Sequence, residues 1–180
     1  MAALHSSYRI VPHDERWQAT FTSQLKFLRE ALSLSAERIE HIGSTAVPGL
    51  GAKPIVDVMI GVDSEAEYST YVAALSTVGY ECGGETVPGT LYNRKQGPPR
   101  VNAHLTVFGS EFWGEHLLFR DYLRAHPETA SEYEALKRQI LLDPGDLGAD
   151  PPAYNAAKES FIRRVLAVAS ANQAPGTGRE

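Results

Sequence analysis

The eight residues Ile55–Val62, which read Ile-Val-Asp-Val-Met-Ile-Gly-Val, constrain the fold of this chain more than any other segment. They are almost all apolar or β-branched, which is typical of a strand buried on both faces of a sheet. Asp57 is the one ionisable residue among them, and its lost hydration must be offset by a cation, a metal ion or a hydrogen-bond network. The run predicts a central strand with a functional carboxylate; the alternative is a structural aspartate that binds loop N–H groups.

A glycine-serine turn precedes this strand. Residues 38–42 predict a short strand that stops at Gly43, Ser44 and Thr45, and a loop then leads to Pro54. In such a turn the backbone N–H groups and a hydroxyl can point at an anion, while glycine permits close approach. The turn predicts a phosphate site, with a serine-capped tight turn as the alternative. It is not a P-loop, because the Gly-Lys-Ser/Thr ending is missing.

Helical periodicity lies on both sides of the central strand. An apolar stripe at three- and four-residue steps predicts a helix over about residues 14–34. A second stripe predicts a helix over about residues 68–78, and Ser64 with Glu67 forms a capping-box pattern before it. Both helices are expected to pack on the sheet.

The remaining chain has strands first and helices afterwards. Glycines and β-branched residues predict a hairpin around Gly89, and residues 100–108 predict another strand. Three helical patterns follow, over about residues 112–125, 127–142 and 153–169, with an irregular connection over residues 143–152. Because strands and helices do not strictly alternate, the class is α/β or α+β, with a mixed sheet covered by helices.

Composition limits the kind of protein. A chain of 180 residues is expected to form one domain, over residues 1–170, followed by a flexible tail over residues 171–180. The net charge of −5 argues against a nucleic-acid partner. Apolar runs are too short for a membrane span, and the first residues lack a signal-peptide pattern. We therefore expect a cytoplasmic location and no membrane partner.

Polar residues alternate along the strand predicted at residues 100–108. Arg100, Asn102, His104 and Thr106 fall at every second position, so they share one face of the sheet. If this strand lies beside that of Asp57, His104 is a candidate metal ligand, general base or phosphate contact. The alternatives are an exposed sheet face and a hydrogen-bonded histidine.

The later helices carry cations four residues apart from a tyrosine or from another cation, so the members of each pair share a helical face. If these faces converge, the cations would bind phosphates; a solvated face with a snorkelling lysine is the alternative for each pair. The pairs are Arg120 with Arg124, Tyr133 with Lys137, and Tyr154 with Lys158.

Residues 39–57, Ile-Glu-His-Ile-Gly-Ser-Thr-Ala-Val-Pro-Gly-Leu-Gly-Ala-Lys-Pro-Ile-Val-Asp, resemble the signature of the GrpB family. Later blocks resemble it as well, and the likeness covers about residues 8 to 168. These blocks are His104-Leu105, Leu-Phe-Arg-Asp-Tyr-Leu-Arg at residues 118–124, Glu132-Tyr133 with Leu136-Lys137, and Tyr154 with Lys158.

That family is similar to the nucleotidyltransferase superfamily, whose pattern is a Gly-Gly or Gly-Ser pair followed by two acids in the order Asp, hydrophobic, Asp or Glu. The resemblance implies a nucleotidyltransferase-like mixed sheet flanked by helices. It also implies that Gly43, Ser44, Thr45 and Lys53, with the helical cations, bind nucleotide phosphates, and that Asp57 binds Mg²⁺. Met59 stands where the second acid is expected, and a thioether does not bind Mg²⁺. The resemblance also implies a third acid on a neighbouring strand, and His104 and Thr106 are the best candidates for its position.

Three functions follow as hypotheses. The first is an enzyme that uses Asp57 and His104 to transfer a nucleotidyl group from a nucleotide such as ATP to an unknown small-molecule acceptor, with Mg²⁺ as cofactor. The second is a nucleotide- or phosphate-ligand-binding module without turnover, which accounts for Met59. The third is a hydrolase with Ser44 as nucleophile and His104 or His41 as base, although no nucleophile elbow surrounds the serine.

Overall fold

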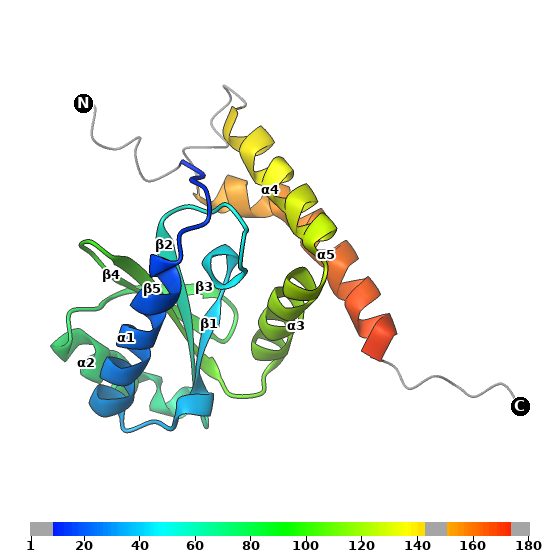
Figure 1. The fold of residues 1–180 in the computed structure, drawn as a ribbon. Coiled ribbons are helices and arrows are strands. Elements are labelled where there is room, and N and C mark those ends of the chain that lie inside the picture. Colours follow the sequence, from blue (N-terminus) through cyan, green and yellow to red (C-terminus); the bar gives the residue numbers. More distant parts are fainter. Residues whose placement is uncertain (1–8, 143–150, 174–180) are drawn as a thin grey trace, which may run out of the picture.

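The computed structural model describes residues 9–142 and 151–173. Within those ranges the chain forms a five-stranded mixed sheet in the order β1-β2-β5-β4-β3 (Figure 1). The central strands β2 and β5 are parallel, and the other neighbouring pairs are antiparallel. The strands are β1 (Ile39–Ile42), β2 (Ile55–Val62), β3 (Glu81–Val87), β4 (Thr90–Lys95) and β5 (Arg100–Val107). The mixed sheet, its central strand and the hairpin at Gly89 confirm the predictions from the sequence.

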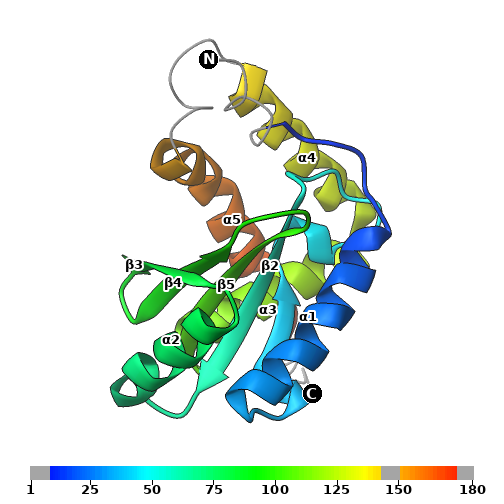
Figure 2. The same cartoon turned by 90° about the vertical axis from the view of Figure 1, so that its left-hand side faces the viewer.

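Helices cover both faces of the sheet. Helices α1 and α2 lie on one face and α3 lies on the other, while α4 and α5 lie toward the end of the sheet at which β2 begins (Figures 1 and 2). The helices are α1 (Arg16–Leu32), α2 (Tyr68–Thr77), α3 (Glu111–Ala125), α4 (Pro127–Leu142) and α5 (Pro151–Gln173). Within the described ranges, every helix is too short or too polar to cross a membrane.

The main core lies between the sheet and helices α1 and α2. The stripe of α1 predicted from its periodicity is buried through Trp17, Phe21, Leu28 and Leu32, and it meets alternate side chains of β2. Burying one large side chain of this kind stabilises a fold by about 1.5–3 kcal/mol. Ser33 adopts a left-handed conformation with φ of 54°, which ends α1.

A second core holds the loop between β1 and β2 against the later helices. Val47 and Leu50 of this loop are buried and pack with Leu123 of α3, Tyr133 of α4 and Phe161 of α5. The loop therefore has a fixed position between the sheet and three helices, although it has little regular structure of its own.

Some predicted boundaries and one predicted cap are wrong. The Ser64 side chain makes no capping bond; instead Glu67 reaches back to the N–H of Asp63, at 3.0 Å, because residues 65–67 form a tight 3-10 turn before α2. Helix α5 is also longer than predicted. It includes residues 151–152, which were predicted as part of the connection, and residues 171–173, which were predicted as part of the tail. The rest of the predicted connection and tail lies outside the described residues.

Candidate functional site

Asp57 lies near the start of β2, directly opposite Asn102 of β5. The Asn102 amide donates a hydrogen bond of 2.8 Å to Oδ1 of Asp57, and Nε2 of His104 lies 3.5 Å from the same oxygen. Tyr92 of β4 donates from its hydroxyl to Oδ1 of Asn102 at 2.8 Å. The Asp57 side chain is 28% exposed. The carboxylate is thus held by a side-chain network and remains open to solvent and to ligands.

The Gly43-Ser44 turn touches this carboxylate. Gly43 has φ of +71°, and a Cβ built on it would lie 2.9 Å from Oδ2 of Asp57. Glycine is required here both for the left-handed backbone and for the close approach. Ser44 then begins a 3-10 turn, and its side chain is half-buried. The structure therefore brings Gly43 and Ser44 next to Asp57.

Replacing Gly43 with alanine is expected to destabilise the fold more than replacing Gly49 with alanine. Both glycines have positive φ, so each alanine introduces a similar backbone strain of about 1–3 kcal/mol. The Cβ at residue 49 meets nothing within 4 Å, whereas the Cβ at residue 43 meets the Asp57 carboxylate. Thermal unfolding of the two variants measures the difference, and equal losses would show that the contact with Asp57 does not constrain this turn.

Three lysines gather on the other side of Ser44. Nζ of Lys137, from α4, donates to Oγ of Ser44 at 2.9 Å and to the carbonyl of Gly51 at 2.6 Å. Nζ of Lys53 lies 3.6 Å from the centre of the Tyr154 ring, and Nζ of Lys158 lies 4.3 Å from the centre of the same ring. Lys137 and Lys158 of the two tyrosine-lysine pairs lie near enough to interact, and Lys137 contacts Ser44 directly.

Burial changes the charge of these lysines. Burial, together with the charge of nearby Lys158 and against the opposing effect of Glu134, lowers the pKa of Lys137 to about 7. Burial also lowers the pKa values of Lys53 and Lys158 to about 8, against the opposing attraction of Asp57. At pH 7 the Lys137 amine is therefore about half protonated and the other two amines are mostly protonated, and a bound anion would favour the protonated form of each.

Three other predicted phosphate contacts do not join this group. Arg120 is buried and its guanidinium donates to Glu40, at 2.6 Å, to the carbonyl of His41 and to Asp121. Arg124 donates to the carbonyl of Ala46 at 2.9 Å and to Asp121. These arginines hold β1 and the serine turn in place. The third residue, Thr45, is buried and its hydroxyl lies 3.1 Å from Nε2 of His41.

The histidines do not support a hydrolase. His41 is buried against Phe21, which lowers its pKa to about 4, and its Nε2 contacts Thr45 rather than Ser44. Oγ of Ser44 accepts its hydrogen bond from Lys137, and His104 contacts Asp57. In this structure, therefore, neither His41 nor His104 is hydrogen-bonded to Ser44.

The donor set limits how a metal ion can bind. Among the described residues, no group of three or more His, Cys, Asp or Glu side chains could hold a metal ion. Met59 is fully buried beside His104, and Thr106 is buried two positions farther along β5, next to Gly61. Asn102, not His104 or Thr106, faces Asp57 across the strands. Asp57 therefore supplies a single carboxylate to a Mg²⁺ ion, whose coordination would have to be completed by waters and a ligand's phosphate oxygens.

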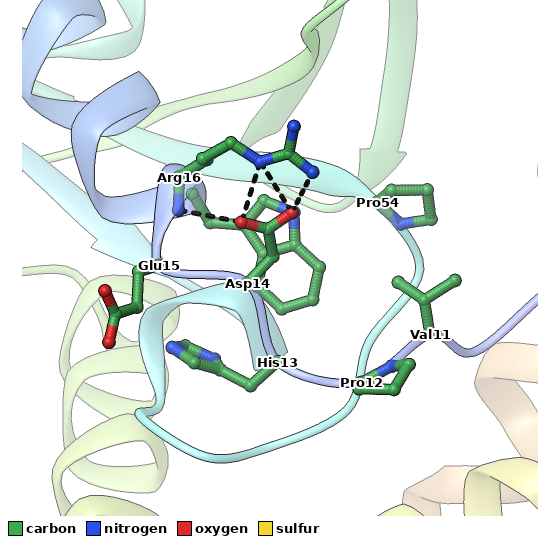
Figure 3. A pocket seen from close by; sticks show the side chains of 8 residues that line it. Val11, Pro12, His13, Asp14, Glu15, Arg16 and Pro54 are labelled. Atoms are coloured by element: carbon green, nitrogen blue, oxygen red, sulfur yellow. Dashed lines mark hydrogen bonds and ion pairs between the residues drawn. The ribbon is translucent and has the colours of Figure 1, made fainter.

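A cavity of about 680 Å³ opens elsewhere, beside the segment that leads into α1 (Figure 3). Its lining includes His13, Asp14, Arg16, Trp17 and Pro54. The Asp14 carboxylate is bound by Arg16, which lowers the pKa of Asp14 to about 2. Because Asp14 and Arg16 pair with each other and Asp57 does not line this cavity, we do not place the functional site here.

Comparison with known proteins identifies the family. Residues 7–167 match the model of the family described as GrpB protein. The chain belongs to the GrpB family. It is 38% identical over 133 residues to the UPF0157 protein YqkA of Bacillus subtilis; the match covers 73% of this chain but only 39% of that relative. This GrpB chain therefore corresponds to less than half the length of YqkA.

Solved structures agree with this assignment and with the fold. The GrpB protein of Enterococcus faecalis superposes with a TM-score of 0.77 at 30% identity, covering 91% of this chain and 98% of that one. The Cid1 poly(U) polymerase, with Mg and 3′-dATP bound, superposes with a TM-score of 0.56 at 13% identity, covering 86% of this chain and 51% of Cid1. The likeness to Cid1 shows that the GrpB chain has a nucleotidyltransferase-like fold.

Proposed function

We propose that this GrpB chain binds a nucleoside triphosphate such as ATP together with Mg²⁺ and transfers its nucleotidyl group to a small-molecule acceptor. The observation that carries the proposal is the position of the Gly43-Ser44 turn, which touches Asp57 on one side and accepts a hydrogen bond from Lys137 on the other. A phosphate chain at this turn would meet a carboxylate suited to Mg²⁺ and an ammonium group at once. The fold shared with Cid1, which has Mg and 3′-dATP bound, supports this choice of ligand.

Each residue then has a distinct task. The N–H groups of the turn and the Ser44 hydroxyl bind phosphate oxygens, and Asp57 holds Mg²⁺, which when bound offsets phosphate charge. His104 lies 3.5 Å from Asp57 and accepts the proton of the acceptor hydroxyl or amine. The acceptor atom forms a bond to the α-phosphorus, the bond to the bridging oxygen breaks, and pyrophosphate leaves. Asn102 keeps the Asp57 carboxylate in position through its 2.8 Å hydrogen bond.

Replacing Asp57 with asparagine is expected to abolish Mg²⁺-dependent stabilisation by ATP. A ligand at one hundred times its Kd stabilises a folded protein by about 2.7 kcal/mol, or about 5–11 °C for a chain of this size. The measurement is thermal unfolding with ATP, with and without Mg²⁺. Asp63→Asn is the matched control, because Asp63 is 76% exposed and pairs with Arg38 on the surface. Absence of any ATP effect on the unmodified chain would refute nucleotide binding.

A second candidate is nucleotide binding without transfer. The observation that favours it is Met59, which is fully buried where a second metal-binding acid is expected. Two-metal phosphoryl transfer uses several carboxylates, and this site has one. Pyrophosphate release in the presence of ATP, Mg²⁺ and mixed small hydroxyl and amine acceptors separates the two candidates. Stabilisation by ATP without such release supports the binding module.

A further inference from the structure

Lys53, Lys137 and Lys158, which we name the lysine cluster, come from three separate elements and meet beside Ser44. Lys53 lies in the loop before β2, Lys137 lies on α4, and Lys158 lies on α5. The pKa of Lys137 is lowered by both of the other lysines, so the three amines interact with one another. Because like charges repel, a cluster of three amines is unfavourable in the ligand-free fold. Such clusters are therefore candidate functional sites.

The charge of Lys137 is not offset within its own contacts. Lys137 is 2% exposed, and its two hydrogen bonds go to neutral oxygens, the Ser44 hydroxyl and the Gly51 carbonyl. The nearby carboxylate of Glu134 accepts from the Gly51 N–H and from Arg138. In the ligand-free protein, a buried ammonium group bonded only to neutral oxygens lowers the stability of the fold. An anion bound beside Ser44 would offset this charge.

Tyr154 fixes the spacing of the other two amines. Its ring is buried, and Lys53 and Lys158 both lie within 4.3 Å of the ring centre. Such contacts favour an ammonium group over the face of the ring. The two amines therefore form a compact pair close to the amine of Lys137.

We propose that the lysine cluster is a subsite for the terminal phosphates of a polyphosphate chain, and that it binds this chain without a metal ion. Three amines match the charge of a di- or triphosphate end better than that of a single phosphate. They supply the positive charge that a second metal ion would supply if residue 59 were an acid. This inference rests on the proposed function for the position of the phosphate chain, but it assigns affinity to the lysines and leaves only Asp57 to Mg²⁺.

Isothermal titration with inorganic tripolyphosphate and orthophosphate, both in EDTA, tests this subsite. Tripolyphosphate is expected to bind at least tenfold more tightly than orthophosphate. In buffers that differ in protonation enthalpy, its binding at pH 8 is expected to take up protons, because the bound anion favours charged amines. Equal affinities, or binding of tripolyphosphate only after Mg²⁺ is added, would overturn the inference.

Variants of single lysines test whether tripolyphosphate binds at the lysine cluster. Lys158→Met is expected to weaken tripolyphosphate binding at least tenfold, and Lys137→Met to reduce the proton uptake as well. Lys158 makes no hydrogen bond to the serine loop among the described contacts, so its variant keeps the measurement valid even if Lys137→Met unfolds the chain. Lys26→Met, at an exposed site on α1, is the control and should leave the affinity unchanged. Unchanged affinity in Lys158→Met would contradict the proposal.

The same titrations separate this inference from the proposed function. Binding of ATP with Mg²⁺, combined with no binding of tripolyphosphate in EDTA, would refute the metal-free subsite and leave the proposed function standing. Tight binding of tripolyphosphate, with no binding of ATP in the presence of Mg²⁺, would support the subsite and refute the nucleotide as ligand.

Discussion

Replacing Arg120 with methionine is expected to lower the free energy of unfolding by about 3 kcal/mol, with a fall in Tm of about 6–12 °C. The guanidinium is 10% exposed and joins α3 to β1 through Glu40 and the carbonyl of His41. Methionine fills similar space but leaves a half-buried carboxylate and a buried carbonyl without their donor. This loss of unfolding free energy is at the low end of the range for breaking a buried ion pair, because Glu40 is 32% exposed. Thermal or urea unfolding measures it.

Arg163→Met provides the comparison for that experiment. Arg163 pairs with Glu159 one turn away on α5, and its side chain is 78% exposed. Exposed pairs of this kind contribute less than about 0.5 kcal/mol, so Tm should change by no more than about 2 °C. Similar shifts in both variants would show that Arg120 does not anchor α3 to β1.

Loss of the charge of Lys137 alone is expected to lower the affinity for tripolyphosphate by about fiftyfold between pH 7 and pH 9. The amine of Lys137 carries its charge below its pKa of about 7 and loses it above that value. About half of the ligand-free molecules are protonated at residue 137 at pH 7 and about one in a hundred at pH 9, whereas the bound form keeps the proton. The groups that surround this amine are Lys158, Lys53, Glu134 and Arg138, and burial has the largest effect.

Titrations of the unmodified chain and of Lys137→Met across this range isolate the effect. The ratio of the two Kd values cancels the titration of the ligand itself, and it should shrink toward 1 as the pH rises. In the ligand-free protein the sign is opposite: the unfolded chain binds more protons at residue 137 between about pH 7 and 10.5, so this lysine adds stability as the pH increases. A ratio that does not change with pH would show that the charge of Lys137 plays no part in binding.

The central part of the site could be predicted from the sequence because its signals are local. A buried apolar run containing one aspartate, preceded by a glycine-serine turn, places Asp57 and Gly43 on adjacent elements, and the structure shows them in contact. Alternation along β5 also placed Asn102 on the face of His104. Alternation does not predict the register of β5 against β2, and this register makes Asn102 the partner of Asp57. Tyr92 was missed for the same reason, since its bond to Asn102 depends on the pairing of β4 with β5.

The helical cations could be predicted only in part. Spacing by four shows that Arg120 and Arg124 share a face, as Tyr154 and Lys158 do, but it does not show where that face points. The packing of α3 against β1 turns the two arginines toward backbone carbonyls of β1 and the serine turn, whereas α5 directs Lys158 to the cluster. The failed capping box at Ser64 has a similar origin, because a 3-10 turn changed which N–H lies within reach of Glu67.

Both backbone groups of Gly51 are bound from α4, the N–H by Glu134 and the carbonyl by Lys137. Lys137 and Ser44 are 93 positions apart in the chain. During synthesis from the N-terminus, the turn beside Asp57 leaves the ribosome long before the helix that fastens it. A nascent chain that has only the sheet therefore holds Asp57 and Lys53 but lacks Lys137 and Lys158, which arrive with α4 and α5.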